Sequence, residues 1–351
     1  MHIEDLRTRL RAAGALPCHE AVVLQAWTHG LPLDHGRRRA ETFLPATLRA
    51  ALPTIAAGLA AMAHVRAEHP AADGSARLLV GLADGQAVES VLLPRDGVCV
   101  STQVGCAVGC TFCMTGRDGL ARQLGSAEIV AQVALARARR PVRKVVFMGM
   151  GEPAHNLDAV MDAIDLLAVA GGIAHKNLVF STVGDRRVFE RLPAGRVKPA
   201  LALSLHTTRA ALREQLLPRA PRIAPAELVA LAQAYAGATG YPVQYQWTLL
   251  EGVNDGDDEV DAIASLLAGQ YAVMNFIPWN RVDGADFRRP AWERAAEMVR
   301  VLHRRGVLAK LRDSAGQDVD AGCGQLRARE APARAARAGV VPLRAHHAGA
   351  A

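Results

Sequence analysis

From about residue 97 onward, short apolar runs alternate with longer segments of helical periodicity. Two of the runs, at residues 145–148 and 200–203, are continuously apolar, which is typical of parallel strands buried on both faces. Strands that are joined by helices in this way form a parallel sheet covered by those helices. We therefore predict an α/β fold whose six strand–helix units form an open or partial (β/α)6 barrel.

The expected elements can be placed along the chain. The six expected strands cover residues 97–102, 144–148, 178–182, 200–205, 243–249 and 271–277, and a last β-run covers 307–312. The expected helices cover residues 126–139, 157–169, 226–239, 257–267 and 292–305. Because the sites of such barrels lie at the carboxyl ends of the strands, residues just after these runs are the first candidates for a functional site.

Three regions are expected along the chain. Residues 1–72 carry apolar residues at helical spacing and predict a small N-terminal helical accessory domain, with its last helix at 44–65 and a linker at 69–74. Residues 73–326 begin with a β-hairpin, marked by Asp84-Gly85 between two β-runs, and continue into the barrel. Residues 327–351 are rich in Ala and Arg without an apolar face, and predict a disordered basic tail.

The composition limits the partners and the compartment. A formal net charge of +7 suits a polyanionic partner such as nucleic acid, but an arginine-rich composition with a basic tail gives the same charge. No apolar run of about 18 residues occurs, so we expect no membrane span. The first residues are polar rather than typical of a signal peptide, and three of the six cysteines are clustered rather than scattered. We expect a cytoplasmic protein that acts as a monomer.

Cys106, Cys110 and Cys113 share one short loop with C-x3-C-x2-C spacing. Three thiolates can hold an iron–sulfur cluster that normally takes four protein ligands, and the iron without a ligand is then open to a substrate. The alternatives are a zinc knuckle or cysteines that serve as small core residues. Zinc needs a fourth ligand, and the nearest downstream histidine is His155. Phe112, next to the last cysteine, would shield a cluster.

The cysteine loop, the Gly149-Met150-Gly151-Glu152-Pro153 turn and the partial barrel resemble the radical S-adenosylmethionine (SAM) superfamily. Further motifs narrow the resemblance to the dual-specificity RNA adenine-C2 methyltransferases, which modify an adenosine in large-subunit rRNA and, in some members, in tRNA. The motifs lie at residues 99–113, 146–153, 204–206, 252–255, 277–280 and 320–326, in the family order. The resemblance covers about residues 86–326.

The resemblance implies a role for each matched residue. It implies one [4Fe–4S] cluster on Cys106, Cys110 and Cys113, and two SAM molecules per turnover. The implied SAM contacts are Gly151, Glu152, Ser181, Ser204, Leu205, His206 and Asn280. The implied catalytic residues are Glu89, Cys99 and Cys323. The implied partners are RNA (rRNA and, in some members, tRNA) and an external electron donor such as flavodoxin or ferredoxin.

The implied reaction needs both catalytic thiols. One SAM methylates Cys323, and a second SAM yields a 5′-deoxyadenosyl radical that takes a hydrogen atom from this methyl group. The resulting carbon radical adds to adenine C2, an electron-poor carbon that does not attack SAM by itself. Glu89 then takes the C2 proton. Cys99 attacks the Cys323 sulfur, which forms a disulfide and releases the methylated RNA.

Other interpretations stay open at this point. The chain could be a radical SAM enzyme with a non-RNA substrate, or a non-catalytic Fe–S protein that binds RNA. Pattern alone predicts that Glu89 is a solvent-facing strand residue and that Cys99 and Cys323 are idle thiols. The chain also departs from the family pattern, because Arg281-Val282-Asp283 replaces a proline-containing turn after Asn280. This difference concerns the RNA target and its docking surface rather than the catalytic set.

Overall fold

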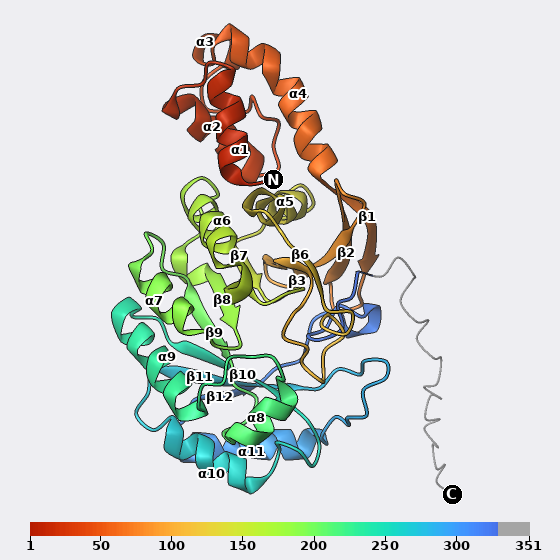
Figure 1. Cartoon of the computed structure of the whole chain (residues 1–351), viewed down its shortest axis with the longest axis vertical. Coiled ribbons are helices and arrows are strands. Elements are labelled where there is room, and N and C mark those ends of the chain that lie inside the picture. The colour runs from red at the N-terminus through yellow and green to blue at the C-terminus, as the bar shows by residue number, and fades with distance from the viewer. Residues whose placement is uncertain (329–351) are drawn as a thin grey trace, which may run out of the picture.

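The expected strands belong to one mixed sheet of ten strands (Figure 1). The computed structural model describes residues 1–328, and the predicted basic tail from residue 329 onward lies outside the described residues. The strands of this sheet are β1 (Ala63–Pro70), β2 (Ala76–Leu82), β3 (Ala87–Leu93), β4 (Gly97–Cys99), β7 (Lys144–Phe147), β8 (Leu178–Thr182), β9 (Ala200–Ser204), β10 (Val243–Leu249), β11 (Ala272–Pro278) and β12 (Ala309–Leu311).

The order of the strands confirms the predicted partial barrel. Strands β4 and β7 to β12 pair in parallel in chain order, and β1 to β4 extend the sheet as an antiparallel meander. Because β1 and β12 lie at opposite ends of the strand order, the sheet stays open. A separate antiparallel pair, β5 (Gln103–Gly105) and β6 (Leu120–Gln123), brackets the cysteine loop.

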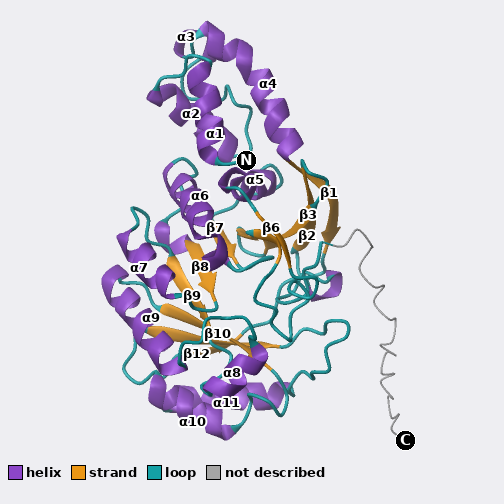
Figure 2. Cartoon of the chain, viewed as in Figure 1, coloured by secondary structure: helices purple, strands orange, loops and turns teal. Residues whose placement is uncertain are grey.

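The helices pack around this sheet. They are α1 (Ile3–Ala12), α2 (Pro17–Thr28), α3 (Ala40–Phe43), α4 (Ala46–Met62), α5 (Ser126–Arg137), α6 (Leu157–Val169), α7 (Arg186–Ala194), α8 (Ala210–Leu216), α9 (Pro225–Thr239), α10 (Asp257–Leu266) and α11 (Trp292–Arg304). Helices α6, α7, α9, α10 and α11 lie outside the curved sheet (Figure 2), with α9 against β9 and β10 and α11 against β11 and β12. No helix within residues 1–328 is both long and apolar enough to cross a membrane.

The region between the N-terminal helices and the hairpin differs from the prediction. Helix α4 ends at Met62, and the expected helix end and the first two residues of the expected linker belong instead to strand β1, which pairs with β2. Residues 71–74 form the turn between these two strands. The side chains of β1 alternate between buried or half-buried and exposed, which is the period of a strand with one covered face. A run of only eight residues after a helix is too short for periodicity to separate the two structures.

The N-terminal helices lie together at one end of the molecule (Figure 1). Helices α1 and α2 contact α5, and the Ile3 amide donates a hydrogen bond of 2.9 Å to the Ser126 hydroxyl at the start of α5. The Arg137 guanidinium, at the other end of α5, donates to the Thr28 carbonyl at the end of α2. The division of the chain at residue 72 stays a prediction.

The turn after β10 is built around Asn254, whose side chain is fully buried. Its carboxamide oxygen accepts a hydrogen bond from the Leu250 amide, and its nitrogen donates to the carbonyls of His206 and Thr248 at 2.7 and 2.8 Å. Since buried polar groups are stable only when they are paired, one side chain satisfies three backbone groups. The motif at residues 252–255 therefore supports the turn and the backbone at His206.

We expect Asn254→Ala to lower the free energy of unfolding by about 3 kcal/mol, because it leaves the buried Leu250 amide and two carbonyls without partners. Urea denaturation followed by circular dichroism measures this change. Asp158→Ala, which removes an exposed carboxylate paired with Arg191, is the control and should change the free energy by less than about 0.5 kcal/mol. Equal effects of the two substitutions would contradict the scaffolding role of Asn254.

Candidate active site

A cavity of about 160 Å³ lies at the carboxyl ends of the parallel strands. The residues that line it include all three loop cysteines, the Gly149–Pro153 turn after β7, Ser181 of β8, Ser204 of β9 and Cys323. These segments are far apart in the sequence, but parallel strands bring their carboxyl ends to one edge of the sheet. Most of the site residues expected from the sequence therefore surround one space.

The loop between β5 and β6 holds the cysteines in place through its backbone. The Cys106 amide donates to the Gly119 carbonyl at 2.9 Å, and the Thr111 amide donates to Leu216 at the end of α8. Gly109 has a φ of +67°, and a Cβ there would approach a guanidinium nitrogen of Arg219 to 2.5 Å. Glycine is favoured here because other residues rarely adopt this left-handed backbone conformation, and a Cβ would also force the Arg219 side chain to move.

The electrostatics of the three thiols fit a cationic cluster. Burial raises the pKa of Cys106 to about 12, and burial together with the neighbouring Cys113 and Cys106 raises the pKa of Cys110. Three thiolates in one cavity repel each other, and bound iron removes this repulsion while it displaces the protons. Within residues 1–328, no three Cys, His, Asp or Glu side chains are grouped as a single metal ion requires. A cubane cluster fits the loop better, because its thiolate ligands bind separate irons.

Glu152 closes one wall of the cavity, at the end of the turn after β7. It is buried, and its carboxylate accepts hydrogen bonds from the amides of Ala154 and Val183 at 3.1 and 3.0 Å. Burial raises the pKa of Glu152 to about 7, although these hydrogen bonds oppose the shift. Its own amide donates to the Gln103 side chain at 2.7 Å, which ties the Gly-rich turn to β5.

His206 follows β9 in a strained, left-handed backbone conformation with a φ of +64°. Its Nδ1 accepts a hydrogen bond from the Thr248 amide at 3.0 Å, so the ring proton is on Nε2. Burial and the neighbouring Arg213 lower the pKa of His206 to about 3, which keeps the imidazole neutral. Its ring centre lies 4.9 Å from that of the buried Phe112, which shields this side of the cysteine loop.

Leu205 and Asn280 do not line the cavity itself. The Leu205 side chain is fully buried, and its amide donates to the Gln246 carbonyl. Asn280 lies behind the wall, where its Nδ2 donates to the Ser314 hydroxyl at 2.8 Å and to the Cys323 carbonyl at 3.0 Å. The Asn280 Oδ1 is buried and has no hydrogen-bond partner in the described part of the chain.

Cys99 and Cys323 lie close enough to interact electrostatically. Burial raises the pKa of Cys99 to about 12, and the neighbouring Cys323 raises it further. Both thiols are free, and Cys323 is exposed at the cavity while Cys99 is buried behind it. The sequence pattern alone predicts that Cys99 and Cys323 are two idle thiols. The fold instead brings these two cysteines together, although they are more than two hundred positions apart in the sequence.

The register of the antiparallel strands places Glu89 on the same face as Cys99. Cys99 pairs with Val91, and Glu89 is two residues before Val91, so the two side chains point to one side of the sheet. The expected solvent-facing position of Glu89 is wrong, because only 1% of the residue is exposed. Its carboxylate is ion-paired with the buried Arg77 and accepts a hydrogen bond of 2.8 Å from the Arg327 amide.

Comparisons with known proteins agree with this arrangement. Residues 100–266 match the family described as the radical SAM superfamily. A probable RNA methyltransferase from Aromatoleum aromaticum is 75% identical over 329 residues, which cover 94% of this chain and 93% of that protein. Another from Thiobacillus denitrificans is 72% identical, with 94% and 91% covered. The crystal structure of a radical SAM methyltransferase from Sphaerobacter thermophilus is 36% identical, with a TM-score of 0.81 over 94% of this chain and 98% of that one.

This chain belongs to the radical SAM methyltransferase family. Membership makes it an enzyme that uses SAM with an iron–sulfur cluster, in agreement with the interpretation of the cysteine loop. The sequence also left open a non-catalytic Fe–S protein, but the relatives of this chain are named as methyltransferases. The three thiols would hold the cluster, and the cluster bound to SAM supplies a carbon radical in this superfamily.

Two residues of this radical SAM methyltransferase escaped the sequence analysis. Arg213 of α8 is buried beside Cys110 and Glu152 and donates to the carbonyls of Val183 and Ser204. Ser314 hydrogen-bonds to the Cys323 thiol and lowers its pKa, whereas partial desolvation by the surrounding cavity raises it. Both residues lie outside the strand ends, so no positional signal in the sequence marks them.

We expect the triple variant Cys106/Cys110/Cys113→Ala of this radical SAM methyltransferase to lose its cluster while it stays folded, because the loop backbone is anchored by hydrogen bonds that alanine keeps. Iron analysis and visible absorption after anaerobic reconstitution measure the cluster, with about four irons expected in the wild type. Cys18→Ala, which removes an exposed thiol of α2, should leave the iron content unchanged. Full iron content in the triple variant would overturn the assignment.

Proposed function

We propose that this enzyme methylates C2 of an adenosine in RNA through an S-methylcysteine on Cys323. The observation that carries the proposal is the pair of free thiols, because Cys323 is exposed at the cavity of the cluster cysteines and Cys99 lies behind it. A methyltransferase that moves a methyl group directly from SAM to its substrate needs neither thiol. A carrier that binds the product covalently needs a second thiol to release it.

The chemistry assigned to the two thiols balances in electrons. The Cys323 sulfur takes a methyl group from one SAM. After this methyl group loses a hydrogen atom to the radical from a second SAM, its carbon adds to adenine C2. The adduct would then lose the C2 proton to Glu89 and return one electron to the centre that cleaved the second SAM. Attack of Cys99 on the Cys323 sulfur then forms the S–S bond and breaks the S–C bond, whose electron pair stays on the carbon. A proton completes the new methyl group. The disulfide must be reduced before the next turnover, and a thiol reductant or an external electron donor supplies those two electrons.

Glu89 is the proposed base for the C2 proton. The position of Glu89 supports this role, because it lies on the face of the β2–β4 meander against which the Cys323 segment packs. Two hydrogen bonds join that segment to the meander, one from Arg77 to the Val319 carbonyl and one from the Arg327 amide to Glu89. The ion pair with Arg77 and the hydrogen bond from the Arg327 amide fix the position of the Glu89 carboxylate.

SAM is proposed to bind along the strand ends, against Gly151, Glu152, Ser181, Ser204 and His206. The turn at Gly151 exposes backbone with a φ of +103°, and Ser181 and Ser204 are half-buried at the cavity wall. The Leu205 contact would have to come from its backbone, since its side chain is in the core. Asn280 lies outside this cavity, but its buried Oδ1 has no donor in the described residues, and such an acceptor is costly unless a ligand supplies one.

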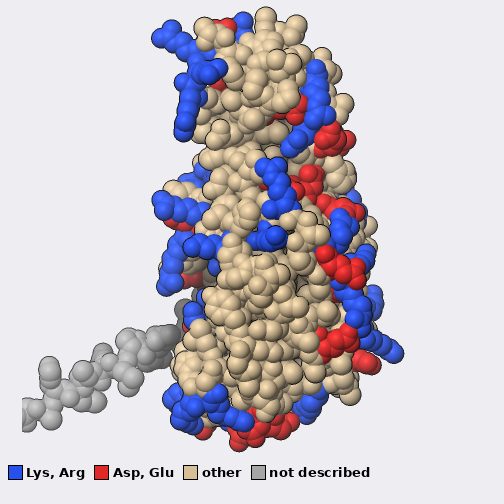
Figure 3. All heavy atoms as spheres, turned by 90° about the vertical axis from the view of Figure 1, so that its left-hand side faces the viewer, with Lys and Arg blue, Asp and Glu red and all other residues tan. Residues whose placement is uncertain are grey.

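RNA is the proposed substrate because the relatives from Aromatoleum aromaticum and Thiobacillus denitrificans are named probable RNA methyltransferases. The formal net charge of +7 agrees with a polyanionic substrate. Over the face that carries α7 and α9, Lys and Arg are interspersed with Asp and Glu (Figure 3). Basic side chains that bind RNA are therefore better sought beside the cavity than on this face.

We expect Cys99→Ala to accumulate RNA joined covalently to Cys323, because the thiol that releases the product is gone. Denaturing gel electrophoresis with labelled RNA detects the adduct, and mass spectrometry of the digested adduct locates the modified adenine carbon. Cys323→Ala should form neither adduct nor product while it still binds SAM, and Cys18→Ala should act as the wild type does. Normal turnover by Cys99→Ala, or a modified carbon other than C2, would contradict the proposal.

We expect Asn280→Ala to weaken SAM binding by about tenfold, the effect of losing one hydrogen bond to a charged ligand. Equilibrium dialysis with labelled SAM on the reconstituted protein measures the affinity. Ser314→Ala is the matched control, since it removes a partner of the Asn280 nitrogen but leaves the unpartnered oxygen. If both variants bind SAM equally weakly, Asn280 acts only by positioning the Cys323 segment.

A further inference from the structure

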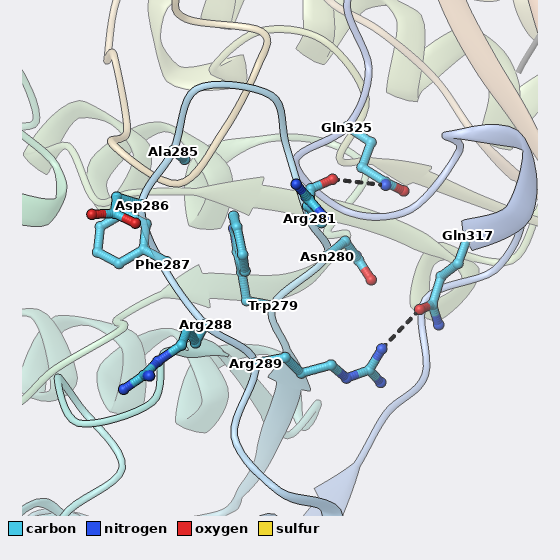
Figure 4. Close-up of a pocket in the computed structure, with 10 residues that line it drawn as sticks. All are labelled: Trp279, Asn280, Arg281, Ala285, Asp286, Phe287, Arg288, Arg289, Gln317 and Gln325. Carbon is cyan, nitrogen blue, oxygen red and sulfur yellow. Dashed lines mark hydrogen bonds between the residues drawn. The ribbon is translucent and has the colours of Figure 1, made fainter. Parts of the chain in front are cut away.

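A second and larger pocket, of about 600 Å³, adjoins the wall that carries Cys323 (Figure 4). One side is the loop after β11, from Trp279 to Arg289, and the other side is formed by Gln317 and Gln325 of the C-terminal segment. We call it the arginine pocket, because Arg281, Arg288 and Arg289 line it. Arg281, the first residue of the stretch at 281–283 where the chain departs from the family pattern, is one of its lining residues.

The arginine pocket is tied directly to the reacting thiol. Gln325, two residues after Cys323, donates a hydrogen bond of 3.1 Å to the Arg281 carbonyl, and Asn280 donates to the Cys323 carbonyl. Two residues of extended chain span at most about 7 Å. A strand of RNA with its reacting adenine at Cys323 therefore brings its neighbouring nucleotide to this pocket.

The charge of the pocket suits phosphate. Three arginines line the pocket, and the only carboxylate among its lining residues in the described part of the chain is that of Asp286. Arg288 is paired with Glu251 at 2.7 Å and Arg289 with Asp313 at 3.0 Å, and Arg289 also donates to Gln317. Arg288 and Glu251 are 82% and 42% exposed, and such exposed pairs are worth only about 0–1 kcal/mol. A phosphate that offers fork-shaped contacts to guanidinium groups can replace these carboxylates.

The pocket also has an aromatic surface. The ring centres of Trp279 and Phe287 are 6.0 Å apart at an interplanar angle of 74°, and the Trp279 indole donates to the Phe112 carbonyl in the cysteine loop. Trp279 is buried, whereas Phe287 is half-buried and keeps part of its ring accessible. Arginines beside an accessible aromatic ring are the combination that binds single-stranded nucleic acid. The concave shape and the volume suit one nucleotide better than a protein surface.

We propose that the arginine pocket binds the nucleotide next to the target adenosine, with its two flanking phosphates on Arg288 and Arg289, which point to different sides of the loop (Figure 4), and its base against Phe287. This inference rests on the proposed RNA substrate and adds the place where that RNA is held. It also gives a role to residues 281–289, because a loop that differs from the family pattern beside Cys323 changes which neighbouring nucleotide is accepted.

The test compares Arg288→Ala/Arg289→Ala with Arg186→Ala/Arg191→Ala, which removes two similarly exposed and paired arginines from α7. The probe is a fluorescein-labelled single-stranded 12-mer of uridines with one central adenosine, and anisotropy gives its Kd from 50 to 300 mM KCl. Two lost phosphate contacts should reduce the slope of log Kd against log salt by about 1.4. The pocket variant should show this change and weaker binding, whereas the α7 variant should match the wild type.

Further measurements keep the result interpretable. Iron content and SAM affinity of the pocket variant should stay at wild-type values, which excludes a folding defect. Phe287→Ala should weaken binding by about tenfold without a change in salt slope, and Phe287→Tyr should restore it, since stacking does not involve phosphate. An unchanged affinity and slope in Arg288→Ala/Arg289→Ala would overturn the proposal.

Two other outcomes separate this proposal from neighbouring ones. If the variant binds RNA normally but accepts electrons more slowly from flavodoxin than from dithionite, the pocket docks an acidic reductant and the RNA proposal is wrong. If the salt slope falls as expected while Cys99→Ala forms no adduct on Cys323, the pocket binds RNA as proposed and the assigned chemistry fails.

Discussion

The hydrogen bonds that hold the Cys323 segment to the rest of the molecule are the constraint on which the site depends. The Met114 amide donates to Gly324 at 2.7 Å, the Thr115 hydroxyl donates to Leu326 at 2.7 Å, and Arg77 donates to Val319 at 2.8 Å. Together they join the end of the described chain to the cysteine loop and to the antiparallel meander. Without them, the barrel would still assemble the loop cysteines and the strand ends, but Cys323 would have no fixed place.

The candidate site residues come from two parts of one sheet. The parallel strands β7 to β10 end around the cavity and present Glu152, Ser181, Ser204 and His206 to it. The antiparallel strands β3 and β4 present Glu89 and Cys99 on one face. Cys323 is placed where the two parts meet, because its turn contacts both. In the proposed reaction, the Cys323 sulfur would therefore lie between the radical source at the parallel strand ends and Cys99 on the antiparallel strands.

The buried polar groups show which parts of the site are complete within the protein alone. Asn254, His206 and Glu152 have their hydrogen-bond partners in the chain, so they form a rigid support. The Asn280 oxygen and the Arg213 Nε are buried without partners in the described residues; Asn280 is bonded to the Cys323 carbonyl, and Arg213 interacts electrostatically with Cys110 and Glu152. Incomplete pairing at these two positions, next to fully paired neighbours, is what a preorganised site for a polar ligand requires.

The sequence by itself determined the parallel strands of the barrel and which residues lie at the strand ends, and it predicted an iron–sulfur cluster at the cysteine loop, because apolar runs and cysteine spacing are local patterns with few structural solutions. It failed at β1, where eight residues after a helix carry too little periodicity, and at Glu89, where alternation could not tell a solvent face from one covered by a distant segment. Only the tertiary structure decided that Cys99 meets Cys323, that Ser314 contacts the Cys323 thiol and that Arg281, Arg288 and Arg289 line one pocket beside it. These contacts depend on long-range packing and strand register, which the spacing of neighbouring residues in the sequence does not predict.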